Sequence, residues 1–218
     1  MIFYFDFLSP YAYIGWSQIH ALAARHGRQV QDAPVLFAGI LNAVGSKGPA
    51  ELPNKRIYVF KDAYRKAHRA GLPPLVPPPS HPFNPLLALR AAAFPTDSAT
   101  HRRFIDGLFA ATWAGGGGIE TEAAVGAIAE QVGLAADEVL AFARREDTKA
   151  ALRERTEQAI AQRVFGVPSV VVDGELFWGT DSFPELEAYL AGADPVPKDL
   201  LERWTHLRPS AVRKGSLV

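Results

Sequence analysis

Hydrophobic positions at the start of the chain follow first the period of a strand and then that of a helix. Residues 2–7 are mostly aromatic and aliphatic, which predicts a buried strand. Ser9 is a favoured N-cap residue, Pro10 suits the first helical position, and apolar residues at helical spacing continue toward Gly27. A second strand is predicted over residues 30–37. The chain is therefore predicted to open as a strand–helix–strand unit.

The middle of the chain has the pattern of helices. Residues 39–53 lack a regular period and predict a loop, and a helix is expected over 56–70. The stretch 73–85 holds seven prolines and predicts an irregular connector. Further helices are expected at 86–94, 98–113, 120–132 and 136–165, with a break of the last one placed near 146–147.

Strand patterning returns after residue 166. Residues 167–172 predict a third strand, Asp173-Gly174 is a hairpin signal, and residues 175–178 form the returning strand. A final helix is expected over 183–190. From residue 194 onward, proline mixed with polar residues predicts an irregular tail.

This order of elements, a helical insert between a βαβ half and a ββα half, resembles the DsbA-like branch of the thioredoxin fold. The predicted fold class is accordingly α/β. The resemblance implies a discontinuous thioredoxin-like domain at 1–38 and 164–193. It also implies a helical insertion domain at 39–163 and a C-terminal tail at 194–218.

Composition narrows the classes of function. Lys plus Arg and Asp plus Glu both number 23 in 218 residues, so net charge favours neither nucleic acid nor a membrane surface as partner. Cysteine is absent, which excludes disulfides and thiolate metal sites, so thiol chemistry requires a thiol from outside. No apolar run approaches the ~20 residues that span a bilayer, and no basic signal-peptide start is present, so we expect a cytoplasmic protein. His68 and His81 lack the spacing of metal ligands, and no metal site is expected.

Ser9 stands where the first strand gives way to the first helix. In thioredoxin-like proteins this turn carries the reactive group, and here it reads Ser9-Pro10-Tyr11-Ala12. Free N–H groups and the helix dipole favour an anion at this point. The Ser9 hydroxyl can therefore donate a hydrogen bond to a bound thiolate and lower the pKa of that thiol. The alternative is that Ser9 only caps the helix, and the two roles are compatible.

Two further segments are candidates for ligand binding. In "FGVPS", at 165–169, a proline that opens the third strand of a thioredoxin fold is commonly cis and leaves the preceding backbone free to pair with an extended ligand. We therefore predict that Val167-Pro168 is cis and borders the Ser9 site, the alternative being an ordinary trans bond. In "FWGTDS", at 177–182, Asp181 can receive the ammonium group of a peptide ligand, or Asp181 or Ser182 can cap the last helix.

Four motifs together carry a more specific resemblance: "FYFDFLSPYAY" at 3–13, "PNKR" at 53–56, "FGVPS" and "FWGTD". In this order, around a helical insert, they resemble 2-hydroxychromene-2-carboxylate isomerases, which belong with the kappa-class glutathione transferases. The resemblance runs from about residue 2 to 190. It implies a glutathione-dependent isomerase of aromatic catabolism, acting on a product of naphthalene-type ring degradation, and it suggests a homodimer.

The resemblance also implies roles for individual residues. Ser9 matches the serine that contacts the glutathione sulfur, and Val167, next to Pro168, matches the residue whose backbone pairs with the cysteinyl part. Asn54 and Lys55 match an Asn-basic pair that meets the organic substrate. Leu41 stands where a substrate-side lysine is implied, and the nearest lysine is Lys47. The γ-glutamyl end is expected at Trp178, Gly179, Thr180, Asp181 and Ser182.

The implied reaction requires rotation about a carbon–carbon double bond. A thiolate that adds reversibly to the conjugated system makes that bond single, and elimination after rotation returns the thiol. Asp6 and Tyr11 flank the turn and are assigned no step. Two alternatives remain open: a kappa-class-like glutathione transferase acting on another electrophile, and a non-catalytic thioredoxin-like binding module.

Overall fold

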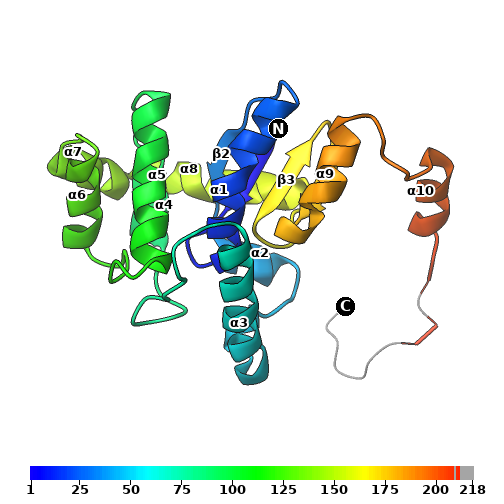
Figure 1. Cartoon of the computed structure of the whole chain (residues 1–218), viewed down its shortest axis with the longest axis horizontal. Helices are drawn as coiled ribbons and strands as arrows, with labels where there is room; N and C mark the ends of the chain where they lie inside the picture. The colour runs from blue at the N-terminus through cyan, green and yellow to red at the C-terminus, as the bar shows by residue number, and fades with distance from the viewer. Residues whose placement is uncertain (209, 212–218) are drawn as a thin grey trace.

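A four-stranded sheet forms the centre of the computed structural model, which describes residues 1–208 and 210–211 (Figure 1). The strand order is β2-β1-β3-β4. β1 (Ile2–Phe5) pairs in parallel with β2 (Gln31–Pro34) and antiparallel with β3 (Ser169–Val172), and β4 (Glu175–Trp178) pairs antiparallel with β3. The predicted βαβ opening and the predicted hairpin near the end are confirmed.

Alternation along β1 sends side chains to two different helical layers. Phe3 and Phe5 are buried with residues of α1 (Pro10–Arg25) and α9 (Phe183–Leu190). Tyr4 points to the opposite face, where it is buried with residues of α2 (Phe37–Ala43) and α8 (Glu146–Ala161). The sheet is thus covered on both faces.

The helical insert shares its core with the sheet. The ring of Phe109, from α5 (Ser98–Trp113), lies 4.8 Å from that of Phe7 and 5.5 Å from that of Phe5, measured between centroids. α3, by contrast, extends away from the body at the lower edge of Figure 1. The remaining elements of the insert are η1 (Pro49–Glu51), α3 (Pro53–Arg69), α4 (Leu86–Ala91), α6 (Glu122–Gln131) and α7 (Ala136–Arg144).

One helix of the insert replaces a predicted loop. Residues 37–43 form α2 although 39–53 were expected to be irregular. Its N-terminal amides find partners far away in sequence: the Leu36 N–H donates to Thr156 Oγ1 at 3.0 Å, and the Phe37 N–H donates to Asp6 Oδ2 at 2.9 Å. Because these partners are distant in the sequence, no capping residue next to the helix marks where it begins.

Two elements in the second half of the chain differ from the predicted ones: the helix expected over 136–165 and the C-terminal tail. The expected helix over 136–165 is divided at Arg145, whose extended backbone ends α7 and begins α8, close to the break placed at 146–147. The tail is not wholly irregular, because α10 (Lys198–Thr205) lies within it, and residues 209 and 212–218 of the expected tail fall outside the described residues. Within the described part of the chain, no helix has the length and apolar character needed to cross a bilayer.

Candidate functional site

Ser9 lies at the junction of two turns that are far apart in the sequence. It is the N-cap of α1, is only 6% exposed, and accepts the Ala12 N–H at 3.2 Å. Its hydroxyl also donates to the Val167 carbonyl oxygen at 3.2 Å. The Val167–Pro168 peptide bond is cis, as predicted. Capping by Ser9 is therefore confirmed, and so is its contact with the turn before β3.

The backbone of the Ser9 turn is held by side chains. The Asp6 carboxyl is fully buried and accepts N–H groups from Leu8 at 3.0 Å and Phe37 at 2.9 Å. The Phe7 carbonyl accepts the Trp113 indole N–H at 2.9 Å. Burial raises the pKa of Asp6 from 3.8 to about 7, although the two N–H groups favour its ionised form. The turn thus has little freedom to move.

The segment 178–182 is hydrogen-bonded to the Val167-Pro168 turn. The Gly179 N–H donates to the Pro168 carbonyl at 2.9 Å, and the φ of +79° at this position favours glycine. The Ser182 hydroxyl donates back to the Gly179 carbonyl at 2.8 Å, so Ser182 occupies the N-cap of α9 without a side-chain capping bond. Trp178 is 54% exposed and its ring lies 5.1 Å from that of Phe165. Ser9, Val167, Pro168 and this segment are therefore neighbours.

A network of charged groups, which sequence reasoning missed, joins this segment to α3. Lys66 Nζ lies 2.8 Å from the Asp181 carboxylate and 2.9 Å from that of Asp62. The Tyr11 hydroxyl donates to Asp62 Oδ2 at 2.7 Å, and Lys66 lies over the Tyr11 ring. Burial and then the Asp62 carboxylate raise the pKa of Tyr11, so the phenol stays protonated. The i,i+4 spacing of Asp62 and Lys66 was the available sequence signal.

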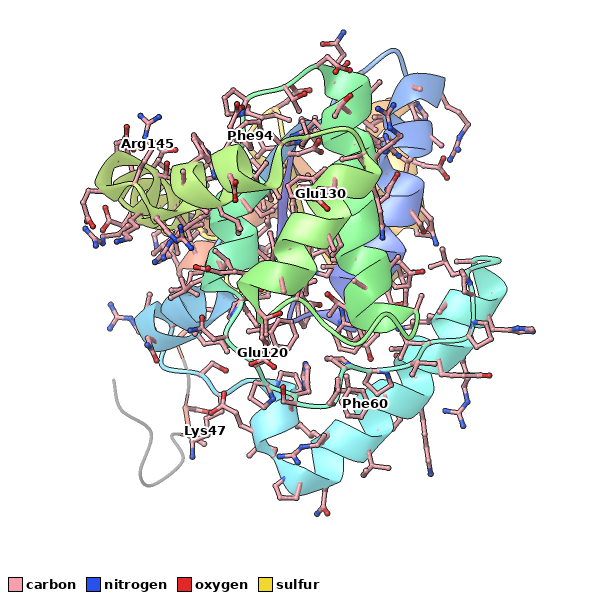
Figure 2. The ribbon with its side chains drawn as sticks, turned by 90° about the vertical axis from the view of Figure 1, so that its left-hand side faces the viewer. Lys47, Phe60, Phe94, Glu120, Glu130 and Arg145 are labelled. Atoms are coloured by element: carbon pink, nitrogen blue, oxygen red, sulfur yellow. The ribbon has the colours of Figure 1, made fainter. Side chains whose placement is uncertain are left out.

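Asn54 and Lys55 occupy a different environment. Both are exposed in the first turn of α3, two to three turns before Asp62 and Lys66. Lys47 is exposed on the loop before η1 (Figure 2). Among the described residues, no hydrogen bond or ion pair joins any of these three side chains to the Ser9 turn. Nor do those residues contain a group of three or more His, Cys, Asp or Glu arranged to hold a metal ion.

Comparison with known proteins places this arrangement in a family. A family profile described as a DSBA-like thioredoxin domain matches residues 1–191. A 2-hydroxychromene-2-carboxylate isomerase of Sphingobium xenophagum is 30% identical over 190 residues, which are 86% of this chain and 96% of that protein. The chain belongs to the 2-hydroxychromene-2-carboxylate isomerase family.

Structural comparison agrees with this membership. A solved structure of a 2-hydroxychromene-2-carboxylate isomerase superposes with a TM-score of 0.80 at 26% identity, covering 96% of this chain and all of the other. The human protein named glutathione S-transferase kappa 1 is 28% identical over 224 residues, covering 96% of this chain and 94% of that protein. The DsbA-like thioredoxin fold is confirmed, and the isomerase family members support an isomerase activity.

Proposed function

We propose that the protein is a glutathione-dependent isomerase acting on 2-hydroxychromene-2-carboxylate or a similar intermediate of aromatic catabolism. The observation that carries this proposal is the contact between the Ser9 hydroxyl and the Val167 carbonyl. This contact joins a hydroxyl donor at the N-terminus of α1 to the backbone that leads into β3. Among the described residues, the Val167 amide has no hydrogen-bond partner, so it is free to receive a peptide-like ligand.

Binding of glutathione requires one exchange of partners at Ser9. A thiolate at the N-terminus of α1 accepts the Ser9 hydroxyl in place of the Val167 carbonyl, which a rotation of the hydroxyl allows. The released carbonyl and the Val167 amide then pair with the backbone of the cysteinyl residue. This arrangement is supported by the state of Val167, whose amide has no partner among the described residues and whose carbonyl is held only by the Ser9 hydroxyl.

The γ-glutamyl end of glutathione carries an ammonium group and a carboxylate on the same carbon. The Asp181 side chain is 76% exposed and its carboxylate can pair with the ammonium group, while Lys66 can pair with the ligand carboxylate in exchange for one of its two present partners, Asp62 or Asp181. Trp178, Gly179, Thr180 and Ser182 form the surrounding segment. The alternation of charge from Asp62 through Lys66 to Asp181 complements such a zwitterion.

The chemical step uses the bound thiol as a nucleophile. The thiolate adds to the conjugated double bond of the ring-opened substrate, and the resulting single bond rotates. Elimination then restores the double bond and returns the thiolate. Ser9 stabilises the thiolate before addition and after elimination, and Asn54 and Lys55 bind the carboxylate and carbonyl of the substrate.

A glutathione transferase activity is the second candidate, favoured by the 28% identity to the human glutathione S-transferase kappa 1. The same activated thiolate would then form a lasting bond to another electrophile. We also propose that the protein is a cytoplasmic homodimer. Sedimentation velocity at several concentrations tests the dimer, and a monomer at all of them contradicts it.

Thermal denaturation with glutathione tests the proposal directly. Glutathione at ~100 times its Kd should raise the free energy of unfolding by about 2.7 kcal/mol. S-methylglutathione is the matched control, since it retains the peptide but cannot form a thiolate. Turnover of the chromene with glutathione, and not with the methylated analogue, is the expected result. No change in Tm at millimolar glutathione contradicts the proposal, and turnover only of generic electrophiles favours the transferase.

A further inference from the structure

His81 belongs to the proline-rich connector between α3 and α4 and is enclosed by aromatic rings. Its imidazole centroid lies 5.4 Å from the rings of Phe60 and Trp113 and 6.3 Å from that of Phe83. Phe60 comes from α3, at the side where this helix meets the connector (Figure 2), and Trp113 ends α5. Three separate parts of the insert therefore surround one histidine.

The hydrogen bond of His81 defines its protonation. Nε2 lies 2.9 Å from the Leu8 carbonyl oxygen, which can only accept, so Nε2 carries the proton. Nδ1 is buried and has no hydrogen-bond partner among the described residues. The imidazole is thus held as the neutral Nε2–H tautomer, with a bare nitrogen on the other side of the ring.

The carbonyl that His81 contacts belongs to the peptide group that leads into Ser9. The amide of that same peptide group, Ser9 N–H, donates to the Asp6 carbonyl at 3.1 Å. The bond from His81 and the bond to Asp6 act on opposite sides of one planar group. Together they fix its orientation, and with it the direction of the Ser9 side chain.

We propose that His81 is a positioning residue for Ser9, whose neutral imidazole orients the Leu8–Ser9 peptide so that the Ser9 hydroxyl points at the Val167 turn. The consequence for thiol chemistry rests on the proposed function, since the same hydroxyl meets the glutathione thiolate. The orienting role itself does not depend on the identity of the ligand. It assigns the connector, rather than the thioredoxin-like half alone, a part in forming the site.

Acid should destabilise the buried imidazole, because protonation adds an Nδ1–H that has no acceptor among the described residues, while the Nε2–H bond to Leu8 remains. Burial lowers the pKa of His81 below 6.5, the Arg56 charge on α3 acts in the same direction, and the Leu8 carbonyl opposes both. Phe60, Trp113 and Phe83 are uncharged and offer no acceptor to a second imidazole N–H. Because the unfolded chain binds the proton more readily, the stability that His81 contributes is complete above pH 6.5. It is lost as the pH falls toward the lower pKa of the folded state.

Two substitutions separate the hydrogen bond from the packing. His81→Phe keeps an aromatic ring but removes the donor, whereas His81→Gln places an amide N–H near the position of Nε2 and does not titrate. His68→Phe and His68→Gln are matched controls, because His68 is exposed near the C-terminal end of α3. Hydrogen exchange of residues 6–13, the pKa of the bound glutathione thiol and kcat/KM against pH are measured for each.

His81→Phe should accelerate exchange in residues 6–13 about tenfold and lower kcat/KM about tenfold at neutral pH, with part of the rate recovered at alkaline pH. His81→Gln should restore both at neutral pH and remove the His81 contribution to the acid limb. Both His68 variants should match the wild type. If His81→Gln is as impaired as His81→Phe, or if His81→Phe matches His68→Phe, the positioning role is wrong.

The experiment also distinguishes failure of this inference from failure of the proposed function. A wild-type protein that does not bind glutathione refutes the function, yet hydrogen exchange and the nitrogen NMR shifts of His81 still report on positioning. A protonated Nε2 and bare Nδ1 at neutral pH, together with exchange that depends on His81, support the inference. The opposite tautomer overturns it even if glutathione binds.

Discussion

The Ser9 turn and the first turn of α3 are built in opposite ways. In the Ser9 turn, buried side chains and backbone bonds hold each peptide group, and Ser9 is 6% exposed. At the start of α3, Asn54 and Lys55 are exposed, and Ile57 and Tyr58, which follow Arg56, are 57% and 63% exposed. The proposed thiol end of the site is therefore part of the core, and the proposed substrate end is on a helix surface.

Because of this difference, thiol activation and substrate binding should respond separately to substitutions. A side chain at the start of α3 can change without disturbing the core, so substrate preference can vary among related proteins. The Ser9 turn cannot be altered so freely, because its groups are also bonded to α2, to Trp113 of α5 and to His81 of the connector. Perturbation should therefore affect stability and thiol chemistry together at one end, and substrate affinity alone at the other.

The largest effect is expected from Asp6. Because burial raises its pKa from 3.8 to about 7, the stabilisation is complete below pH 3.8 and is lost as the pH rises through 7. The wild type should lose roughly 4 kcal/mol relative to Asp6→Asn across this window. Chemical denaturation of both proteins at several pH values measures the difference, and parallel stability curves would refute it.

Ser9→Ala should follow in size. Charge-assisted hydrogen bonds contribute roughly 1.5–3 kcal/mol, so kcat/KM with glutathione should fall about ten- to a hundredfold at neutral pH. Raising the pH should recover part of the rate, because more thiolate forms unaided. Ser17→Ala, an exposed serine on the same helix, is the control. Coincident pH–rate profiles for Ser9→Ala and wild type would leave Ser9 as a cap that contributes about 1 kcal/mol to stability.

Gly166→Ala tests whether Trp178 contacts the γ-glutamyl end of glutathione, because Gly166 packs against the Trp178 indole. A Cβ at this position would lie 2.5 Å from Trp178 Nε1 and force the half-exposed indole to move. Reordering one large side chain should weaken glutathione binding about three- to tenfold. Isothermal titration calorimetry measures the Kd, with Gly126→Ala in α6 as a distant control. An unchanged Kd would mean that Trp178 does not contact the ligand.

The smallest effect is expected at the exposed end. Asn54→Ala and Lys55→Ala should each raise KM for the organic substrate about fivefold and leave the Kd of glutathione and the Tm unchanged. Lys61→Ala, an exposed change on the same helix, is the control. Loss of stability or of glutathione binding in either variant would contradict the contrast between the two regions, since it would make the start of α3 part of the buried site.

Elements that depend on residues adjacent in the chain were predicted, and elements that depend on partners distant in the sequence were not. The Ser9-Pro10 helix start, the proline before β3 and the Asp173-Gly174 turn each follow from residues adjacent in the chain, and the structure has all three. The helix α2 lacks such a signal, because Asp6 and Thr156 supply its N-terminal contacts.

The same reasoning applies to the candidate site. Ser9 and Val167 were expected to adjoin because their positions in the fold require it, and they do. The link from Tyr11 through Asp62 and Lys66 to Asp181 depends on how α3 lies against α1 and η2 (Thr180–Ser182), which no local pattern specifies. The role of His81 was hidden for the same reason, since its acceptor lies 73 residues earlier.

The separation of Ser9 from Val167 bears on the order in which the chain folds. These residues lie 158 positions apart, and β1 must pair with β3 across a longer stretch still, as in Tyr4 with Ser169 and Ile2 with Val171. Contacts of such long range form late, after local helices, because closing a large loop of chain is slow. During synthesis, α1 through α8 leave the ribosome before Val167 does. The thiol site is therefore expected to be absent from every nascent chain until β3 has emerged, and a chain truncated before residue 167 should gain no protection from glutathione.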